Sequence, residues 1–334
     1  MADLATEKDS AWKSAWVALP IGAALVLAVV AVVRHARETQ LKPRPDKIYL
    51  YEEDRKYRAV DPALIKYREA GRLETAFRQP RGIALDGAGR LLIAGDKAIR
   101  RFSADGKPQA EWPLSGEPRS LAVAEDGRIY VAFMTQVEVL SADGKPQAKW
   151  TALPKPAYFT SIAVSAEDVW VADSGNRLVW RHDHDGHKKG DLGRQNDATG
   201  YPGLVIPSPH LDVALAADGT IWVTNPGKHR LECYDRSELL LRNWGRPAAE
   251  IDGFCGCCNP TDFALLPDRR FVTSEKGLAR VKVYGAEGKF ECVVAAPEVF
   301  AEDVVGLDLA ADAQGRIYVL DPSAKAVRIF ARKD

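Results

Sequence analysis

The sequence has no excess of charge of either sign. It contains 46 lysines and arginines and 46 aspartates and glutamates among 334 residues. A protein that binds a nucleic acid backbone presents a basic surface that neutralises phosphates. The balanced charge therefore argues against a nucleic acid partner.

Several catalytic signatures are absent as well. The chain has no Gly-x-Ser-x-Gly motif, no Walker loop and no dinucleotide-binding fingerprint. These absences remove the usual sequence evidence for an α/β-hydrolase, a P-loop nucleotidase or a dinucleotide-binding enzyme. Cysteine is scarce, with five in the whole chain.

One long apolar run stands near the start of the chain. Residues 15–33 carry no charge, and a helix of ~19 residues crosses the ~30 Å hydrocarbon layer of a membrane. A buried core helix or a cleaved signal peptide are the alternatives, but the run ends at Val33-Arg34-His35 without a small-residue cleavage site. The pattern predicts a tail at 1–14, one transmembrane helix at 15–34 and a linker at 35–64.

The orientation of this anchor follows less directly from the charges. Two lysines precede the run and five basic residues follow it between Arg34 and Lys47. The positive-inside rule would place the following domain in the cytoplasm, although the rule weakens for long translocated domains. We favour a single-pass protein of a bacterial-type inner membrane, with the large domain on the periplasmic side.

The strongest signal is an internal repeat. A segment from Gln79 recurs from Glu117, 38 residues later, and both copies contain SADGKPQA. Further copies begin near Phe159, His210, Asn259 and Val305. Each copy reads as short strands broken by turn residues, as at Asp86-Gly87 and Asp105-Gly106 of the first copy, and Asp-Gly turns are strong hairpin signals.

Four strands in each ~40-residue unit, repeated six times, predict an all-β, six-bladed β-propeller over residues 65–334. In the first copy the expected strands are 83–85, 91–93, 99–102 and 109–112. The sixth copy ends after its third strand, Val327 to Phe330. We therefore expect Leu73 to Phe77 to close the ring beside the C-terminal strand, which would remove a free sheet edge.

The repeat resembles the NHL family, whose units read Pro-x-Gly-Ile-Ala-Val, then Asp-Gly, then Val-Ala-Asp-x-x-Asn-x-Arg-Ile. Residues 171–178 match this pattern closely, whereas the second copy has Phe133 in place of the aspartate. The resemblance covers residues 46–334 and implies the fold rather than a function. Lactonases of the gluconolactonase type are more distant relatives by this resemblance, which implies a cation held at the ring mouth by Glu, Asn and Asp.

Aligning the copies predicts which residues surround the mouth of the ring. Arg81 and Arg119 occupy equivalent positions, followed in the other copies by Thr160, Leu211, Thr261 and Val305. The next position holds Gly82, Ser120, Ser161, Asp212, Asp262 and Gly306. Loops between the second and third strands contribute Asp96, Asp173, Asn225, Glu275 and Asp321. Arginines opposite Asp212 and Asp262 would recognise a charged small ligand or the tail of a partner, or would form a salt-bridge ring that ties the blades together.

Three loops that lead into blades are enlarged, namely 194–209, 246–258 and 297–303. The second contains Cys255, Cys257 and Cys258, and nearby arginines would lower a thiol pKa. Three interpretations compete: a soft metal site for copper(I) or zinc with His210 or Glu275 as a further ligand, a redox pair, and a structural turn. Cys233 and Cys292 are expected to be buried in strands, and an iron–sulfur cluster would need four cysteines.

The string His182-Asp183-His184-Asp185-Gly186-His187 also contains metal-binding residue types. It aligns with an Asp-Gly turn of the first copy, so we interpret it as a solvated turn. His210 is the one histidine placed for a zinc like that of NHL-type amidation lyases.

The favoured function is non-enzymatic: a membrane-anchored module that presents one propeller face to a protein partner or small ligand. A metal-dependent hydrolase or lactonase at the central mouth is the main alternative, using Asp173, Asn225, Glu275 and Asp212 as ligands. A thiol–disulfide protein is the third.

Overall fold

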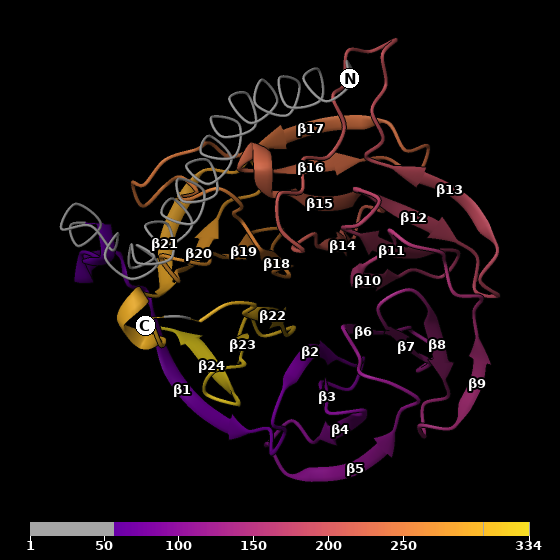
Figure 1. The fold of residues 1–334 in the computed structure, drawn as a ribbon. Helices are drawn as coiled ribbons and strands as arrows, with labels where there is room; N and C mark the ends of the chain where they lie inside the picture. The colour runs from indigo at the N-terminus through magenta and orange to yellow at the C-terminus, as the bar shows by residue number, and fades with distance from the viewer. Residues whose placement is uncertain (1–56, 303, 334) are drawn as a thin grey trace, which may run out of the picture. The chain divides into compact units, whose positions relative to one another are not determined.

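The computed structural model of the chain describes residues 57–302 and 304–333. These residues form six four-stranded antiparallel sheets, which Figure 1 shows as the blades of a ring. In blades 1 to 5 the strands follow the order of the chain from the centre of the ring outward. The sequence prediction of an all-β, six-bladed propeller is confirmed.

The strand bounds show how regular the repeat is. Blades 1 to 3 contain β2 (Pro80–Leu85), β3 (Leu91–Gly95), β4 (Ala98–Phe102), β5 (Pro108–Pro113), β6 (Ser120–Val123), β7 (Ile129–Ala132), β8 (Val137–Leu140), β9 (Pro146–Lys149), β10 (Phe159–Val164), β11 (Val169–Asp173), β12 (Leu178–His182) and β13 (Lys188–Leu192). Blades 4 to 6 contain β14 (Val213–Leu215), β15 (Ile221–Asn225), β16 (Arg230–Tyr234), β17 (Leu240–Trp244), β18 (Asp262–Leu265), β19 (Phe271–Ser274), β20 (Val281–Tyr284), β21 (Phe290–Ala295), β22 (Asp308–Ala311), β23 (Ile317–Asp321), β24 (Ala326–Arg332) and β1 (Tyr67–Glu74). Short 3-10 turns occupy η1 (Pro62–Leu64), η2 (Pro226–Lys228) and η3 (Pro297–Val299).

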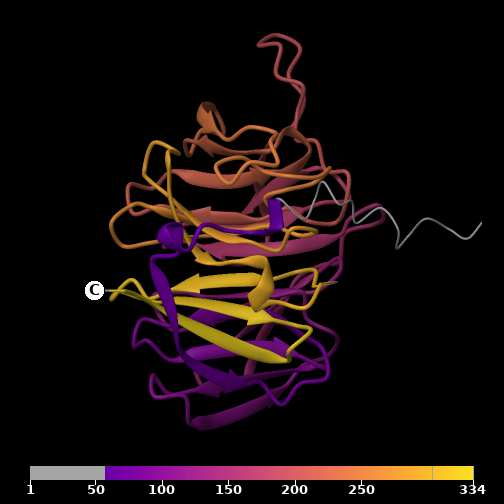
Figure 2. The same cartoon turned by 90° about the vertical axis from the view of Figure 1, so that its left-hand side faces the viewer.

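Strand β1 closes the ring as the outermost strand of blade 6, beside β24 (Figures 1 and 2). The ladder runs from the Tyr67–Arg332 pair to the Glu74–Ala326 pair. The predicted partner is therefore correct, but the closing strand begins six residues before the expected Leu73. The reason is that β24 continues to Arg332, so the strand that pairs with it starts earlier.

The outer hairpins fit together through a recurring pair of residues. A tryptophan near the end of the fourth strand packs against the turn glycine of the next blade. A Cβ added at Gly144 would lie 2.2 Å from the Trp112 ring, and one at Gly288 would lie 2.2 Å from Trp244. Both glycines have positive φ, so the turn glycine serves both hairpin geometry and blade packing.

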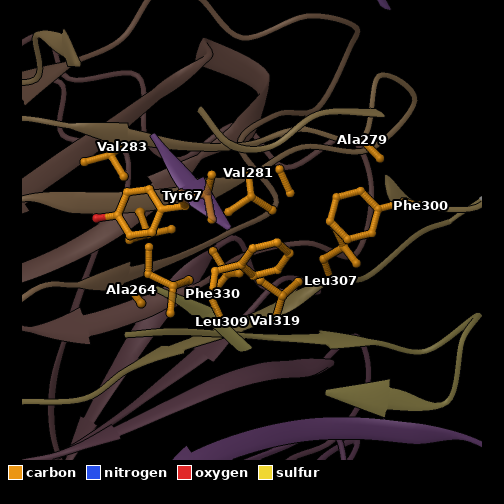
Figure 3. Packing of buried hydrophobic residues seen from close by; sticks show 14 of the residues in the cluster. Tyr67, Ala264, Ala279, Val281, Val283, Phe300, Leu307, Leu309, Val319 and Phe330 are labelled. Atoms are coloured by element: carbon orange, nitrogen blue, oxygen red, sulfur yellow. The ribbon is translucent and has the colours of Figure 1, made fainter. Parts of the chain in front are cut away.

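Apolar residues fill the spaces between blades. Figure 3 shows the cluster at blades 5 and 6, where Tyr67 of β1 and Phe330 of β24 lie among Val281, Val283 and Leu309. All five side chains are buried. The closing strand thus contributes to the core as well as to the ladder.

The predicted transmembrane helix at 15–34, with the tail and most of the linker around it, lies outside the described residues. Within residues 57–302 and 304–333, no helix is long and apolar enough to span a membrane.

Candidate functional site

A cavity of about 310 Å³ lies at the mouth of the ring. It is lined by residues at the beginnings of the six innermost strands, which converge at the centre of Figure 1. Its charged and aromatic wall residues are Arg81, Arg119, Tyr158, His210, Asp212, Asp262 and Asp308.

Asp308 was missed by the sequence alignment, which placed Gly306 at this position. The turn hydrogen bonds give the correct register. In blade 5 the donor of the turn hydrogen bond, the Leu266 N–H, lies four residues after Asp262 and bonds the Arg270 carbonyl. In blade 6 the equivalent donor, the Asp312 N–H, lies four residues after Asp308 and bonds the Arg316 carbonyl. A usable signal was present, because blades 4, 5 and 6 share the pattern Asp, apolar residue, Ala at this point.

The three aspartates join neighbouring blades through backbone hydrogen bonds. Asp212 accepts from the Phe263 N–H at 2.9 Å. Asp262 accepts from the Leu309 N–H at 3.0 Å. Asp308 accepts from the Ile83 N–H at 2.9 Å, across the closure from blade 6 to blade 1. The carboxylates therefore hold blades 4, 5, 6 and 1 in sequence around the mouth.

Burial also disfavours the ionised form of these three carboxyl groups and raises their pKa values. It raises the pKa of Asp212 to about 6. Burial and the charge of Asp212 raise the pKa of Asp308 to about 7. Burial, followed by the charges of Asp212 and Asp308, raises the pKa of Asp262 well above its usual range. Because the Asp262 and Asp308 carboxyls are hydrogen-bonded to each other, the cluster retains a proton near neutral pH.

Arg81 and Arg119 lie on the blade 1 and blade 2 side of the cavity. The Arg119 guanidinium stacks 4.8 Å from the centre of the Tyr158 ring, and Arg81 donates to the Gln79 side chain at 3.0 Å. Neither forms an ion pair with a carboxylate of the described residues. The structure thus brings the predicted arginines and aspartates to one cavity, with backbone amides rather than arginines as partners of the aspartates.

Asp173, Asn225 and Glu275 do not line this cavity. Each is buried at or near the end of a second strand and accepts a backbone N–H from the loop that leads into its own blade. The donors are the Tyr158 N–H to Asp173 at 2.9 Å, the Val205 N–H to Asn225 at 3.0 Å and the Cys255 N–H to Glu275 at 3.2 Å. These three predicted site residues therefore fix the lead loops, that is, the loops that precede the innermost strands of blades 3, 4 and 5.

The signature Asp-x-x-Asn in residues 173–176 has a local structural explanation. Asp173 also accepts from the Asn176 N–H at 3.0 Å, from the Asn176 side chain at 2.7 Å and from the Trp180 indole N–H at 2.8 Å. These bonds close the turn between β11 and β12. A carboxylate with four donors has little capacity left for a cation.

His210 lines the cavity, whereas the cysteines that it was predicted to join do not. Burial and the nearby charge of Lys276 lower its pKa to about 4. The imidazole is therefore neutral at physiological pH and can donate or accept a hydrogen bond inside the cavity.

The cysteine loop leads into blade 5. The Sγ atoms of Cys257 and Cys258 are 3.2 Å apart, and none of the five cysteines forms a disulfide. Burial opposes ionisation of Cys258, but hydrogen bonds from Lys276 and Ser208 outweigh it and lower the pKa of this thiol. The hydrogen bond to Cys258 raises the pKa of Cys257. Cys233 and Cys292 are buried, as predicted.

The predicted soft-metal ligands are not gathered into one site. Among residues 57–302 and 304–333, the only group of three His, Cys, Asp or Glu donors close enough to share an ion is Asp183, Asp185 and His187. These residues form the predicted turn, in which the Asp185 and His187 N–H groups donate to Asp183. Their local hydrogen bonds explain the cluster without a ligand.

Comparison with known proteins identifies the fold. No family model matches the chain, and no curated protein matches it. Among solved structures, virginiamycin B lyase from Staphylococcus aureus is 16% identical with a TM-score of 0.54, covering 76% of this chain and 81% of the lyase. A Bacteroides thetaiotaomicron protein of unknown function is 16% identical with a TM-score of 0.57, covering 77% of this chain and 70% of that protein. A streptogramin B lyase is 10% identical with a TM-score of 0.53, covering 82% of this chain and all of the lyase (100%). At these identities the likeness is one of six-bladed propeller fold.

Proposed function

We propose that this protein is a membrane-anchored, NHL-type binding module whose central cavity receives an anionic group. The group belongs to a small ligand or to the end of a partner chain in an extracytoplasmic complex. The observation that supports this proposal is the pair of arginines in the cavity wall, neither of which is paired with a carboxylate among residues 57–302 and 304–333. Guanidinium groups suit carboxylate and phosphate because their donors form a planar fork.

The opposite wall is consistent with an anionic ligand. The three aspartates of the cavity wall accept from backbone donors, and the raised pKa values of Asp212 and Asp308 reduce the negative charge they present. Neutral His210 and the half-buried Thr160 complete a surface that can hydrogen-bond a polar ligand. The cavity volume of about 310 Å³ suits a small molecule or a few terminal atoms of a chain.

The proposal is tested by calorimetric titration of the full chain in detergent with citrate, succinate and inorganic phosphate. We expect one anion to bind, with affinity at least tenfold lower in Arg119→Gln and Arg81→Gln, because a charge-assisted hydrogen bond contributes ~1.5–3 kcal/mol. Arg177→Gln is the matched control, since Arg177 is exposed in a strand-connecting turn and lies outside the cavity wall. Equal affinity in the double arginine variant would contradict the proposal, as would binding of spermidine in place of the anions.

The alternative of a metal-dependent hydrolase at the mouth receives no such support. Its ligands were Asp173, Asn225 and Glu275 with Asp212, and the first three are engaged in separate lead loops. A catalytic metal needs several donors that converge and leave an open position. We therefore favour the binding module.

A further inference from the structure

The two adjacent cysteines of the blade 5 lead loop have a geometry that the cavity does not explain. Their Sγ atoms are 3.2 Å apart, which is hydrogen-bonding contact for sulfur and longer than the ~2.05 Å of a disulfide bond. Gly256, with φ of 80°, turns the backbone between this pair and Cys255. The side chains of residues 257 and 258 thus face each other, although both belong to one short loop.

The two thiols differ in access. Cys257 is exposed, whereas Cys258 is buried. Cys258 is hydrogen-bonded by Lys276 and by Ser208, and the Lys276 ammonium donates to the Ser208 hydroxyl at 2.9 Å. A cation held beside a buried sulfur favours the thiolate over the thiol. The loop therefore places an accessible sulfur next to a sheltered sulfur whose ionisation is favoured by its cationic neighbour.

We propose that Cys257 and Cys258 form a redox pair that undergoes reversible thiol–disulfide exchange with a small disulfide or an exposed disulfide of another protein. Cys257 reacts with the external disulfide, and the Cys258 thiolate resolves the product. The inference does not depend on the anion proposed for the central cavity, because neither sulfur lines that cavity.

The exchange balances in two steps. Cys257 loses its proton, its sulfur attacks one sulfur of the external disulfide, and the other sulfur leaves as a thiolate that takes up a proton. The Cys258 thiol then gives up its proton, and its sulfur attacks the Cys257 sulfur, forming the bond between residues 257 and 258 and expelling the second external thiolate, which takes up a proton. The protein loses two protons and two electrons, and the external disulfide gains them.

The product would be easy to reduce again. Adjacent Cα atoms are 3.80 Å apart, which is shorter than the 4.4–6.8 Å usual between disulfide-linked residues. A disulfide between neighbours is therefore strained, and strained disulfides are the labile ones. The pair is suited to exchange rather than to permanent bracing of the loop.

The experiment incubates the reduced full chain in detergent with oxidised glutathione, and follows intact mass and the number of free thiols. We expect the wild-type protein to lose two of its five thiols without a lasting glutathione adduct, and dithiothreitol to restore both. Cys258→Ser should retain a glutathione adduct on Cys257, because no neighbour resolves it. Cys257→Ser should remain largely unmodified, because Cys258 is buried.

Two further variants distinguish this mechanism from general thiol reactivity. Cys255→Ser should behave like the wild-type protein, since Cys255 is outside the pair. Lys276→Met should prolong the lifetime of the mixed disulfide several-fold, because the thiolate at Cys258 loses its cation. A stable adduct on the wild-type protein, or loss of the reaction in Cys255→Ser alone, would overturn the proposal. Far-ultraviolet circular dichroism and melting curves establish that each variant is folded.

Discussion

The two halves of the ring use the same backbone frame with different side chains around the mouth. In blades 1 to 3 the residue at the start of the innermost strand is Gly82, Ser120 or Ser161, and it carries no charge. In blades 4 to 6 it is Asp212, which is buried, or Asp262 or Asp308, which are half-buried, and each is bonded to the next blade. Among the described residues that line the cavity, the arginines are Arg81 of blade 1 and Arg119 of blade 2.

The contrast extends to the lead loops. In blade 2 the residue after the second strand is Phe133, packed in an apolar cluster with Leu121 and Leu140. In blade 5 the corresponding region contains Glu275 with Arg280 and Lys282, and all three side chains are buried. Blade 2 is thus held at this point by apolar packing, whereas blade 5 also depends on buried charges that hold a long loop.

The largest expected effect comes from breaking the blade 5 ion cluster. Glu275 pairs with Arg280 at 2.5 Å and with Lys282 at 3.3 Å. Glu275→Ala leaves two buried cations without their carboxylate, and we expect a loss of ~3–5 kcal/mol in the free energy of unfolding. Urea denaturation measures it. The control is Glu287→Ala, whose exposed pair with Arg242 should matter by less than ~0.5 kcal/mol.

A smaller loss is expected when one inter-blade acceptor is removed. Asp262→Ala removes the inter-blade acceptor of the Leu309 N–H. The donor keeps the Asp308 carboxylate at 3.0 Å, so we expect the loss of one net hydrogen bond, ~0.5–1.5 kcal/mol. Asp262→Asn keeps an acceptor oxygen and should lose less. If thermal unfolding shows equal losses for both variants, the hydrogen bond is not the source of the stability.

The aspartate cluster should also make stability depend on pH. The folded-state pKa of Asp308 is raised to about 7, above the unfolded value of ~3.9. Its contribution is therefore fully present below about pH 4 and is lost as the pH rises through about 7. Asp308→Asn should flatten this decline by on the order of 1–2 kcal/mol, measured as the difference between wild-type and variant unfolding curves from pH 4 to 8. An unchanged slope would show that the carboxyl titrates normally.

The smallest effect is expected in the uncharged half. Ser161 accepts from the Val213 N–H at 3.4 Å, which is long for a hydrogen bond. Ser161→Ala should reduce stability by less than ~0.5–1 kcal/mol in the same melting experiment. A loss as large as that of Asp262→Ala would remove the proposed difference between the two halves.

Much of the fold could be predicted from the sequence because its signals are local. The Asp-Gly turns and the alternation of apolar residues locate the strands, and a missing strand in the sixth copy indicates the closing partner. The position of that strand was less accurate, because the length of β24 depends on pairing across the ring closure. Asp308 was missed for a similar reason: an offset of two residues keeps the same strand face and leaves the local pattern plausible.

The candidate site could be predicted only in part. Sequence spacing indicates that Arg81, Arg119, Asp212 and Asp262 approach the mouth, since equivalent positions of repeated units lie in equivalent places. It does not indicate that the aspartates bind the backbone of the next blade, or that Asp173 and Glu275 bind their own lead loops. These choices depend on which amides lie within ~3 Å once the ring has closed.

The cysteine loop shows the same division. Residues 255–258 alone place three thiols within four positions, which leaves metal, redox and structural interpretations open. The tertiary structure turns two of them toward each other and brings Lys276 and Ser208 beside one. Covalent neighbours and turn residues determine strand positions, whereas the partners of a polar side chain come from segments that only the packed ring brings within hydrogen-bonding distance.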